Sequence, residues 1–334
     1  MTPRMRPLAA ASLLLLAAGC RPKGPVNLCP NLEVASEAAK EREEGNALDV
    51  RAGLTGLIPT LDSGKMLPPA DIRDCREQRV LVPLNDCDDQ PVPAIRLPDR
   101  PLDEQDLVIT DLEGDGFLVW AQAHHFTDGD ALGPVAIASW TKRGIRIAAV
   151  GPLRGPAKHV RLRLEPLSDG QVLIVEGDAC PPDGGACTRV VRVVPIIDDQ
   201  FVDKPMRLNE GGCGGPATFP LSASKEILVD PTKKRRFLLQ RNVVIKDGLG
   251  VVHEEAIIKD VDPRQPNAEG VEFRRVTKAR ELLLDKDGLL VQKGIWQDML
   301  AEHGSVRPSD HVDPAAAPAA GAGTKPEPKP RKRR

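Results

Sequence analysis

The sequence predicts an all-β body between residues 106 and 300. Short runs rich in Val, Ile and Leu, such as "FLVWAQAHHF" and "QVLIVEG", alternate there with polar turns. Long helical periods are missing from the same range. Asp-Gly dipeptides separate several runs and supply the positive φ angles that tight hairpins need. They stand at Asp115-Gly116, Asp169-Gly170, Asp247-Gly248 and Asp287-Gly288.

A weak internal repeat divides this β region into meander units. Residues 117–153 align on residues 171–207 when shifted by 54 positions, and strand falls on strand. A looser copy begins near Glu226, and a fragment follows Leu282. Units of this size resemble the blades of a β-propeller, so the repeat predicts a propeller. A β-sandwich or an open β-meander is the alternative.

The first twenty residues predict a processed secretion signal. Arg4 and Arg6 form a basic region, and residues 8–18 form an apolar stretch of signal-peptide length. Eleven residues are too few to cross a bilayer core as a helix, which needs about 20. The stretch ends abruptly in "LAAGC", and a basic, Pro-rich segment follows Cys20.

The "LAAGC" ending resembles the lipobox of bacterial lipoproteins. Ala17 stands where that pattern has leucine, and Leu16 lies one step earlier. The resemblance implies cleavage before Cys20, a diacylglycerol on its sulfur and stable membrane residence through two or three acyl chains. Because Arg21 rather than Asp follows the cysteine, it also implies the outer membrane rather than the inner one. An ordinary signal peptide is the alternative.

Three further segments flank the β body. Residues 20–50 are expected to form a lipidated tether with a short charged helix over 33–48. Residues 51–105 are Pro-rich and are expected to be irregular and held by disulfides, with apolar residues at helical spacing between 54 and 61. Residues 301–334 end in a low-complexity Ala, Pro and basic tail that is expected to be disordered.

Cysteine parity agrees with an oxidising compartment. Seven cysteines are present, and lipidation of Cys20 leaves six, which allow up to three disulfides. Cys180 and Cys187 flank a turn-rich loop and are the first expected pair. Local spacing then favours Cys75 with Cys87, which leaves Cys29 with Cys213. No C-x2-C pair supports a zinc site.

One acidic turn is a weak candidate for calcium binding. In "DLEGDGF", Asp111, Glu113 and Asp115 offer three carboxylates, and Gly116 permits the bend. The closing carboxylate of a calcium loop is missing, because position 12 is Gln122. An ordinary hairpin turn is therefore the main interpretation, and no other cofactor is expected.

Catalytic motifs are not found in the sequence. His124 and His125 are adjacent, so on a strand they would point to opposite faces and would not share one ion; a surface loop is expected there. No serine lies in a G-x-S-x-G context, and no phosphate-binding glycine loop follows a strand.

Charge and composition limit the partners. The formal net charge is -2, aromatic residues make up 3% and tyrosine is absent, so a base-stacking nucleic-acid platform is not expected. The tail is locally basic and could contact anionic glycans or lipid headgroups in a salt-sensitive way. Its candidate contact residues are Lys329, Arg331, Lys332, Arg333 and Arg334.

These observations leave three hypotheses for function. The first is a non-enzymatic envelope lipoprotein that acts as a scaffold or assembly subunit through contacts with another envelope protein. The second is a ligand- or polysaccharide-binding lipoprotein. The third is a hydrolase without a recognisable motif.

Overall fold

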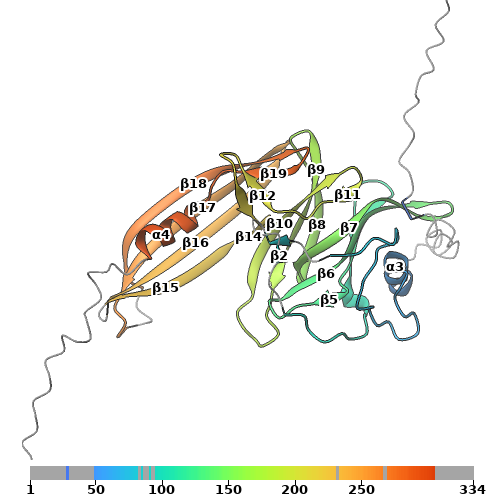
Figure 1. The fold of residues 1–334 in the computed structure, drawn as a ribbon, viewed down its shortest axis with the longest axis horizontal. Coiled ribbons are helices and arrows are strands. Elements are labelled where there is room, and N and C mark those ends of the chain that lie inside the picture. The colour runs from blue at the N-terminus through green and yellow to red at the C-terminus, as the bar shows by residue number, and fades with distance from the viewer. Residues whose placement is uncertain are drawn as a thin grey trace, which may run out of the picture.

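The computed structural model describes residues 28–29, 49–81, 84–85, 90–91, 95–230, 233–265 and 269–304. The described chain is mostly β-structure, which confirms the all-β prediction. It forms an elongated body with three large sheets (Figure 1), which are antiparallel except for the parallel pair β12–β19 in the third.

The first sheet runs in the order β3-β4-β6-β5, and β7 also pairs with β6. Strands β6 and β7 form one long hairpin whose register slips between Ile137 and Ala138. The bounds are Leu107–Asp111 for β3, Gly116–Ala121 for β4, His124–His125 for β5, Asp130–Thr141 for β6 and Gly144–Pro156 for β7.

The second sheet runs in the order β11-β10-β9-β8. Strand β10 pairs with β14 in addition to β9 and β11. Its bounds are Lys158–Leu167 for β8, Gly170–Ala179 for β9, Thr188–Ile197 for β10, Gln200–Phe201 for β11 and Thr218–Pro220 for β14.

The third sheet has seven strands in the order β13-β12-β19-β18-β17-β16-β15, and its long strands project away from the other two sheets (Figure 1). Helix α4, Ile295–His303, packs on one face of this projection. The strand bounds are Met206–Leu208 for β12, Cys213–Gly215 for β13, Ser222–Asp230 for β15, Lys233–Lys246 for β16, Leu249–Val261 for β17, Val271–Asp285 for β18 and Gly288–Val291 for β19.

The sheets stack face to face, and this explains the continuous apolar runs of the sequence. In β9, Leu173 and Val175 pack against the first sheet, whereas Val172 and Ile174 pack against the third. Both faces of the second sheet are therefore buried, so its central strands cannot alternate between apolar and polar residues. Burial of such side chains contributes about 1.5–3 kcal/mol each.

The Asp-Gly dipeptides all lie at hairpin turns, as expected from the sequence. The turn between β16 and β17 shows why they are needed, because Asp247 and Gly248 have φ of 53° and 79°. Two successive positive φ angles give the turn the twist of its flanking strands.

The internal repeat is visible for two strands and then fails. Strands β4 and β6 of the first sheet correspond to β9 and β10 of the second. The next strand, β7, is 13 residues long, whereas the corresponding residues form only the short β11 and β12. The blades of a propeller are also meanders that stack face to face. Here, however, the segment around α3, and not another meander, packs on the outer face of the first sheet. A closed propeller is not confirmed.

The Pro-rich segment before the first sheet is irregular, as expected. It contains helix α3, Val50–Leu57, the 3-10 helix η2, Glu104–Asp106, and the two-residue strands β1, Leu84–Asn85, and β2, Gln90–Pro91. The apolar residues at helical spacing from Leu54 to Leu61 do form α3 and the turn after it, and the leucines among them pack against the first sheet. Asp49 caps the helix by accepting a hydrogen bond from the N–H of Ala52 at 2.8 Å.

Two disulfides join described cysteines. Cys180 pairs with Cys187, which confirms the expected local pair. Cys29 pairs with Cys75, so the pairings of Cys75 with Cys87 and of Cys29 with Cys213 are wrong. The physical reason is that Cys29 is buried with Leu54 and Ile72 on the first sheet, which brings it to Cys75 across 46 residues. Cys213 is also disulfide-bonded.

Several expectations concern residues that the structure does not describe. They are the signal peptide, the lipidation site Cys20, the helix over 33–48, Cys87 and the basic tail with Lys329, Arg331, Lys332, Arg333 and Arg334. In the part of the chain that is described, no helix is both long and apolar enough to cross a bilayer.

Candidate functional site

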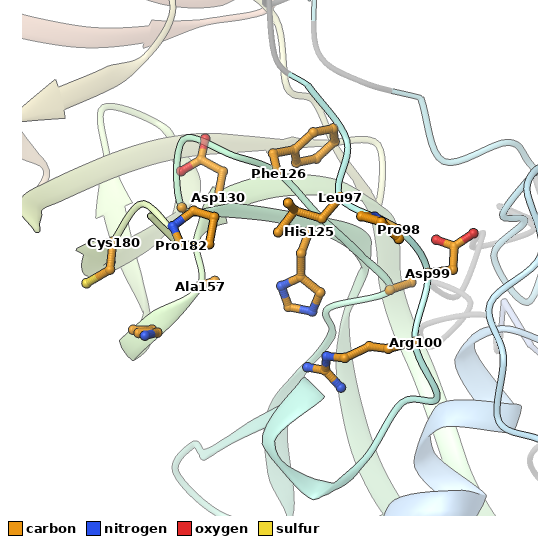
Figure 2. Close-up of a pocket in the computed structure, with 13 residues that line it drawn as sticks. Leu97, Pro98, Asp99, Arg100, His125, Phe126, Asp130, Ala157, Cys180 and Pro182 are labelled. Atoms are coloured by element: carbon orange, nitrogen blue, oxygen red, sulfur yellow. The ribbon is translucent and has the colours of Figure 1, made fainter. Parts of the chain in front are cut away.

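A cavity of about 230 Å³ lies where the Pro-rich segment meets the first and second sheets. Figure 2 shows the loop with Leu97, Pro98, Asp99 and Arg100 on one side of it, and Cys180 and Pro182 of the second sheet's disulfide loop on the other. The ring of His125 extends between them (Figure 2). This cavity is the candidate functional site because it joins a histidine with several charged groups.

His125 is held by a buried carboxylate. Its Nε2 lies 3.0 Å from Oδ1 of Asp106, whose side chain is 1% exposed. Arg100 donates to both oxygens of the same carboxylate, at 2.8 and 2.6 Å. The three side chains thus form one group in which Asp106 fixes the orientation of both its partners.

The position of Asp106 follows from local sequence. Asp103 and Asp106 form a capping box at η2, in which the N–H of Asp103 donates to Asp106 Oδ2 at 2.8 Å. The backbone of Asp106 is also anchored, because its carbonyl accepts from the N–H of Gln122 in the first sheet. The three-residue helix η2 therefore places the Asp106 carboxylate next to the end of β4.

The charge state of Asp106 results from two opposing effects. Burial alone would raise its pKa, but the hydrogen bonds from His125 and Arg100 outweigh burial and hold the pKa below its usual value. Asp106 is therefore ionised at neutral pH and presents a negative charge to His125.

His124 has a different environment from His125, although the two are adjacent in β5. His124 is buried, and its Nδ1 lies 3.2 Å from Oδ1 of Asp99. Burial, followed by the charge of Arg96, lowers the pKa of His124 to about 4. The expectation of a surface loop at these histidines is wrong, because both form a strand under the Pro-rich loop; each contacts its own carboxylate.

A second charged group lies at the other end of the cavity. Arg154 of β7 is buried and pairs with Asp128 and Asp130, while its guanidinium lies 4.8 Å from the centre of the Phe126 ring. Burial, and then the neighbouring charge of Asp128, raises the pKa of Asp130. Arg154 thus joins the turn before β6 to β7, next to Phe126 and Asp130, which line the cavity.

This arrangement can exchange a proton and hydrogen-bond a ligand. A histidine that an aspartate holds in one orientation can give or take a proton from a bound ligand. The described residues that line the cavity include no serine or threonine, Cys180 is in a disulfide, and Lys158 supplies an amine. Together with His125 and Arg100, these groups offer hydrogen bonds to a small polar ligand.

The calcium candidates occupy a hairpin turn. Asp111 ends β3, and Glu113 and Asp115 lie in the turn before β4, where the N–H of Leu112 donates to the carbonyl of Gly116. No group of three or more His, Cys, Asp or Glu side chains that could hold a metal ion occurs among the described residues. In the structure this turn joins the antiparallel strands β3 and β4 as a hairpin.

The sequence interpretation missed the residues that carry the charged groups. Asp106 and Arg100 lie in "DRPLDEQD", where the D-x-x-D spacing of Asp103 and Asp106 is a capping signal. Arg154 stands alone in the apolar run "AAVGPLRGP", and a single charge in such a run indicates a buried, paired side chain.

The chain matches no protein-family model, no curated protein and no solved structure.

Proposed function

We propose that this protein is a lipid-anchored envelope scaffold or assembly subunit, which binds a partner protein along the free edge of its projecting sheet. The observation that carries the proposal is strand β15. It stands last in the order of the seven-stranded sheet, and among the described strands it pairs only with β16. Its other edge presents unpaired backbone groups that an extended partner segment could use.

The register identifies which groups face this free edge. The N–H of Arg241 donates to the carbonyl of Leu221, so Ser222 and Gln240 form a non-hydrogen-bonded pair. Alternation along the strand then turns the N–H groups of Ser224 and Glu226 away from β16. These two positions are the sites at which a partner strand would pair.

Exposed apolar side chains gather at the far end of the same sheet. Leu228 is 57% exposed, Val271 is 75% exposed and Phe273 is 47% exposed. The register links β15, β16, β17 and β18 at this end, which lies away from the other two sheets (Figure 1). A projecting apolar end next to an open strand edge is typical of a protein-interaction surface.

The lipid anchor supports the same proposal. The lipobox-like ending at Cys20 predicts membrane attachment, and a disulfide-bonded body suits an oxidising envelope compartment. We expect the wild-type protein in the membrane fraction and the Cys20→Ala variant in the soluble fraction. Complete membrane partition of Cys20→Ala would contradict the anchor.

Affinity purification from gently solubilised envelopes, followed by mass spectrometry, tests the partner. Ser224→Pro removes an outward N–H, and Leu228→Glu places a charge on the apolar end, so the double variant should lose a stoichiometric partner. Leu249→Glu is the matched control, because Leu249 is 68% exposed at the opposite end of the sheet. Truncation before Asp313 separates a contribution of the basic tail.

Circular dichroism and thermal unfolding should first show that the double variant folds. Retention of the same partner by the folded double variant, or equal loss with Leu249→Glu, would contradict docking at β15.

The cavity at His125 favours ligand binding as a second candidate function. A ligand- or polysaccharide-binding lipoprotein would use the His125 and Arg100 groups as hydrogen-bonding partners. A wild-type protein that purifies without any partner, but whose melting temperature rises with an added polar ligand, would support this candidate instead.

A further inference from the structure

A second cavity, of about 420 Å³, lies at the start of helix α4 in the third sheet. Its walls come from β12, β14, β16 and β18, from the glycine-rich segment around β13, and from the first turn of α4. Apolar side chains line one part of it, and Arg241, Arg280 and Lys293 line another. The apolar residues are Met206, Leu208, Phe219 and Trp296.

The two arginines share one buried carboxylate. Arg241 Nε and Arg280 Nη2 both donate to Oε1 of Glu254 at 2.8 Å, and the Glu254 side chain is fully buried. Among the described residues, no other carboxylate pairs with either guanidinium group, so one of the two positive charges has no ion-pair partner there. Burial of such a charge is costly unless an anion pairs with it.

Hydrogen-bond donors in this cluster are also incompletely used. Arg280 is only 5% exposed, and its Nε has no hydrogen-bond partner in the described structure. Both of its terminal nitrogens are occupied, by Glu254 and by the carbonyl of Gln292. Arg241 donates through Nε and, weakly at 3.5 Å, through Nη1, so its Nη2 has no acceptor among the described residues, and the side chain lines the cavity.

The first turn of α4 adds further donors at the same place. The N-cap residue Gly294 has no side chain to cap the helix. Of the backbone N–H groups in the first turn, Glu254 accepts only that of Ile295. The next two residues, Trp296 and Gln297, line the cavity. Backbone N–H groups at a helix start favour a negative charge.

From these observations we propose that the cavity binds an organic carboxylate that carries an apolar group. One uncompensated charge fits a monoanion, since the third cation, Lys293, is already paired with Asp298 at 2.6 Å. The planar fork of Arg241 matches the two oxygens of a carboxylate. The apolar wall with Trp296 accommodates the rest of the ligand. A peptide C-terminus and a free organic acid share this chemistry.

Calorimetric titration of the full chain with defined probes tests the proposal. N-acetyl-L-leucine and isocaproate both carry a carboxylate and a branched apolar group, whereas N-acetyl-L-leucinamide lacks the charge. We expect the carboxylates to bind at least about tenfold more tightly than the amide, because a charge-assisted hydrogen bond is lost. Tighter binding of N-acetyl-L-leucine than of isocaproate would identify a peptide end, and the reverse a free acid.

The variant Arg241→Gln assigns the binding to this cavity. It leaves Glu254 paired with Arg280 and Ile295, so the protein should fold while carboxylate affinity falls at least about tenfold. Lys293→Gln is the matched control on the exposed rim and should change affinity by less than about threefold. If Arg241→Gln does not fold, Arg241→Lys keeps the charge without the fork and should weaken binding measurably.

Three results would overturn the proposal. The first is equal binding of the amide and the carboxylates. The second is tighter binding of inorganic phosphate than of any carboxylate. The third is no measurable binding of any probe, or unchanged affinity in a folded Arg241→Gln protein.

Discussion

The carboxylate of Glu254 in β17 accepts a hydrogen bond from the backbone N–H of Ile295, the first residue of α4, at 3.0 Å. The sheet thereby caps the helix, which has no side-chain cap of its own because its N-cap is Gly294. Since Glu254 also holds Arg241 and Arg280, one carboxylate joins three strands and a helix.

Replacing Glu254 by Gln should destabilise the protein by about 3 kcal/mol, because two buried guanidinium groups would lose their only carboxylate. Urea unfolding measures the effect. The matched control is Glu255→Gln: this neighbouring carboxylate points to the exposed face, where it pairs with Arg275, and its loss should cost less than about 1 kcal/mol. Equal losses in the two variants would contradict the structural role of Glu254.

The two described disulfides should differ in their effect on stability. Their cysteines are 46 and 7 residues apart, so the loop-entropy model gives about 4 kcal/mol for Cys29–Cys75 and about 2 kcal/mol for Cys180–Cys187. Paired Cys→Ser variants, compared by thermal unfolding, measure this difference. A larger loss for Cys180–Cys187 would mean that native packing, and not loop closure, dominates.

The free energy of unfolding should decline as pH falls from about 6.5 to about 4, because of His124. The unfolded chain takes up a proton near the ordinary histidine pKa of 6.5, whereas burial delays protonation of folded His124 to about pH 4. Its contribution is complete above pH 6.5 and is lost as pH falls through this window. His124→Asn should therefore flatten the stability profile between these limits. His159→Asn, at an exposed histidine, is the control; a slope unchanged by His124→Asn would refute this origin.

Gly133 in β6 should not tolerate any side chain. A Cβ there would lie 1.7 Å from the carbonyl oxygen of Ala121 in the first sheet, so Gly133→Ala should cost about 3 kcal/mol or prevent folding. Gly155→Ala is the matched control, because its Cβ would meet only Val175 and Trp120, at 3.4 and 3.7 Å. Soluble yield and melting temperature measure both. A Gly133→Ala protein as stable as the control would show that the strands can separate there at little cost.

Part of the fold was predictable because its signals are local. The apolar runs around Leu118 and Val172 predict strands, and the Asp-Gly pairs predict their turns, since strand propensity and turn geometry depend on neighbouring residues. The same applies to Cys180 and Cys187, which one short loop brings together. The His125 cavity was not predictable in this way, because Arg100 and Lys158 reach it from different segments.

The all-β class, the hairpin turns and the local disulfide follow from short stretches of the sequence. Long-range packing sets the pairing of Cys29 with Cys75, the burial of His124 beside His125, and the position of Glu254 between Arg241 and Arg280. These relationships depend on how whole sheets and segments stack. Stacking is set by the summed burial of many side chains distant in sequence, which no short stretch of the chain encodes.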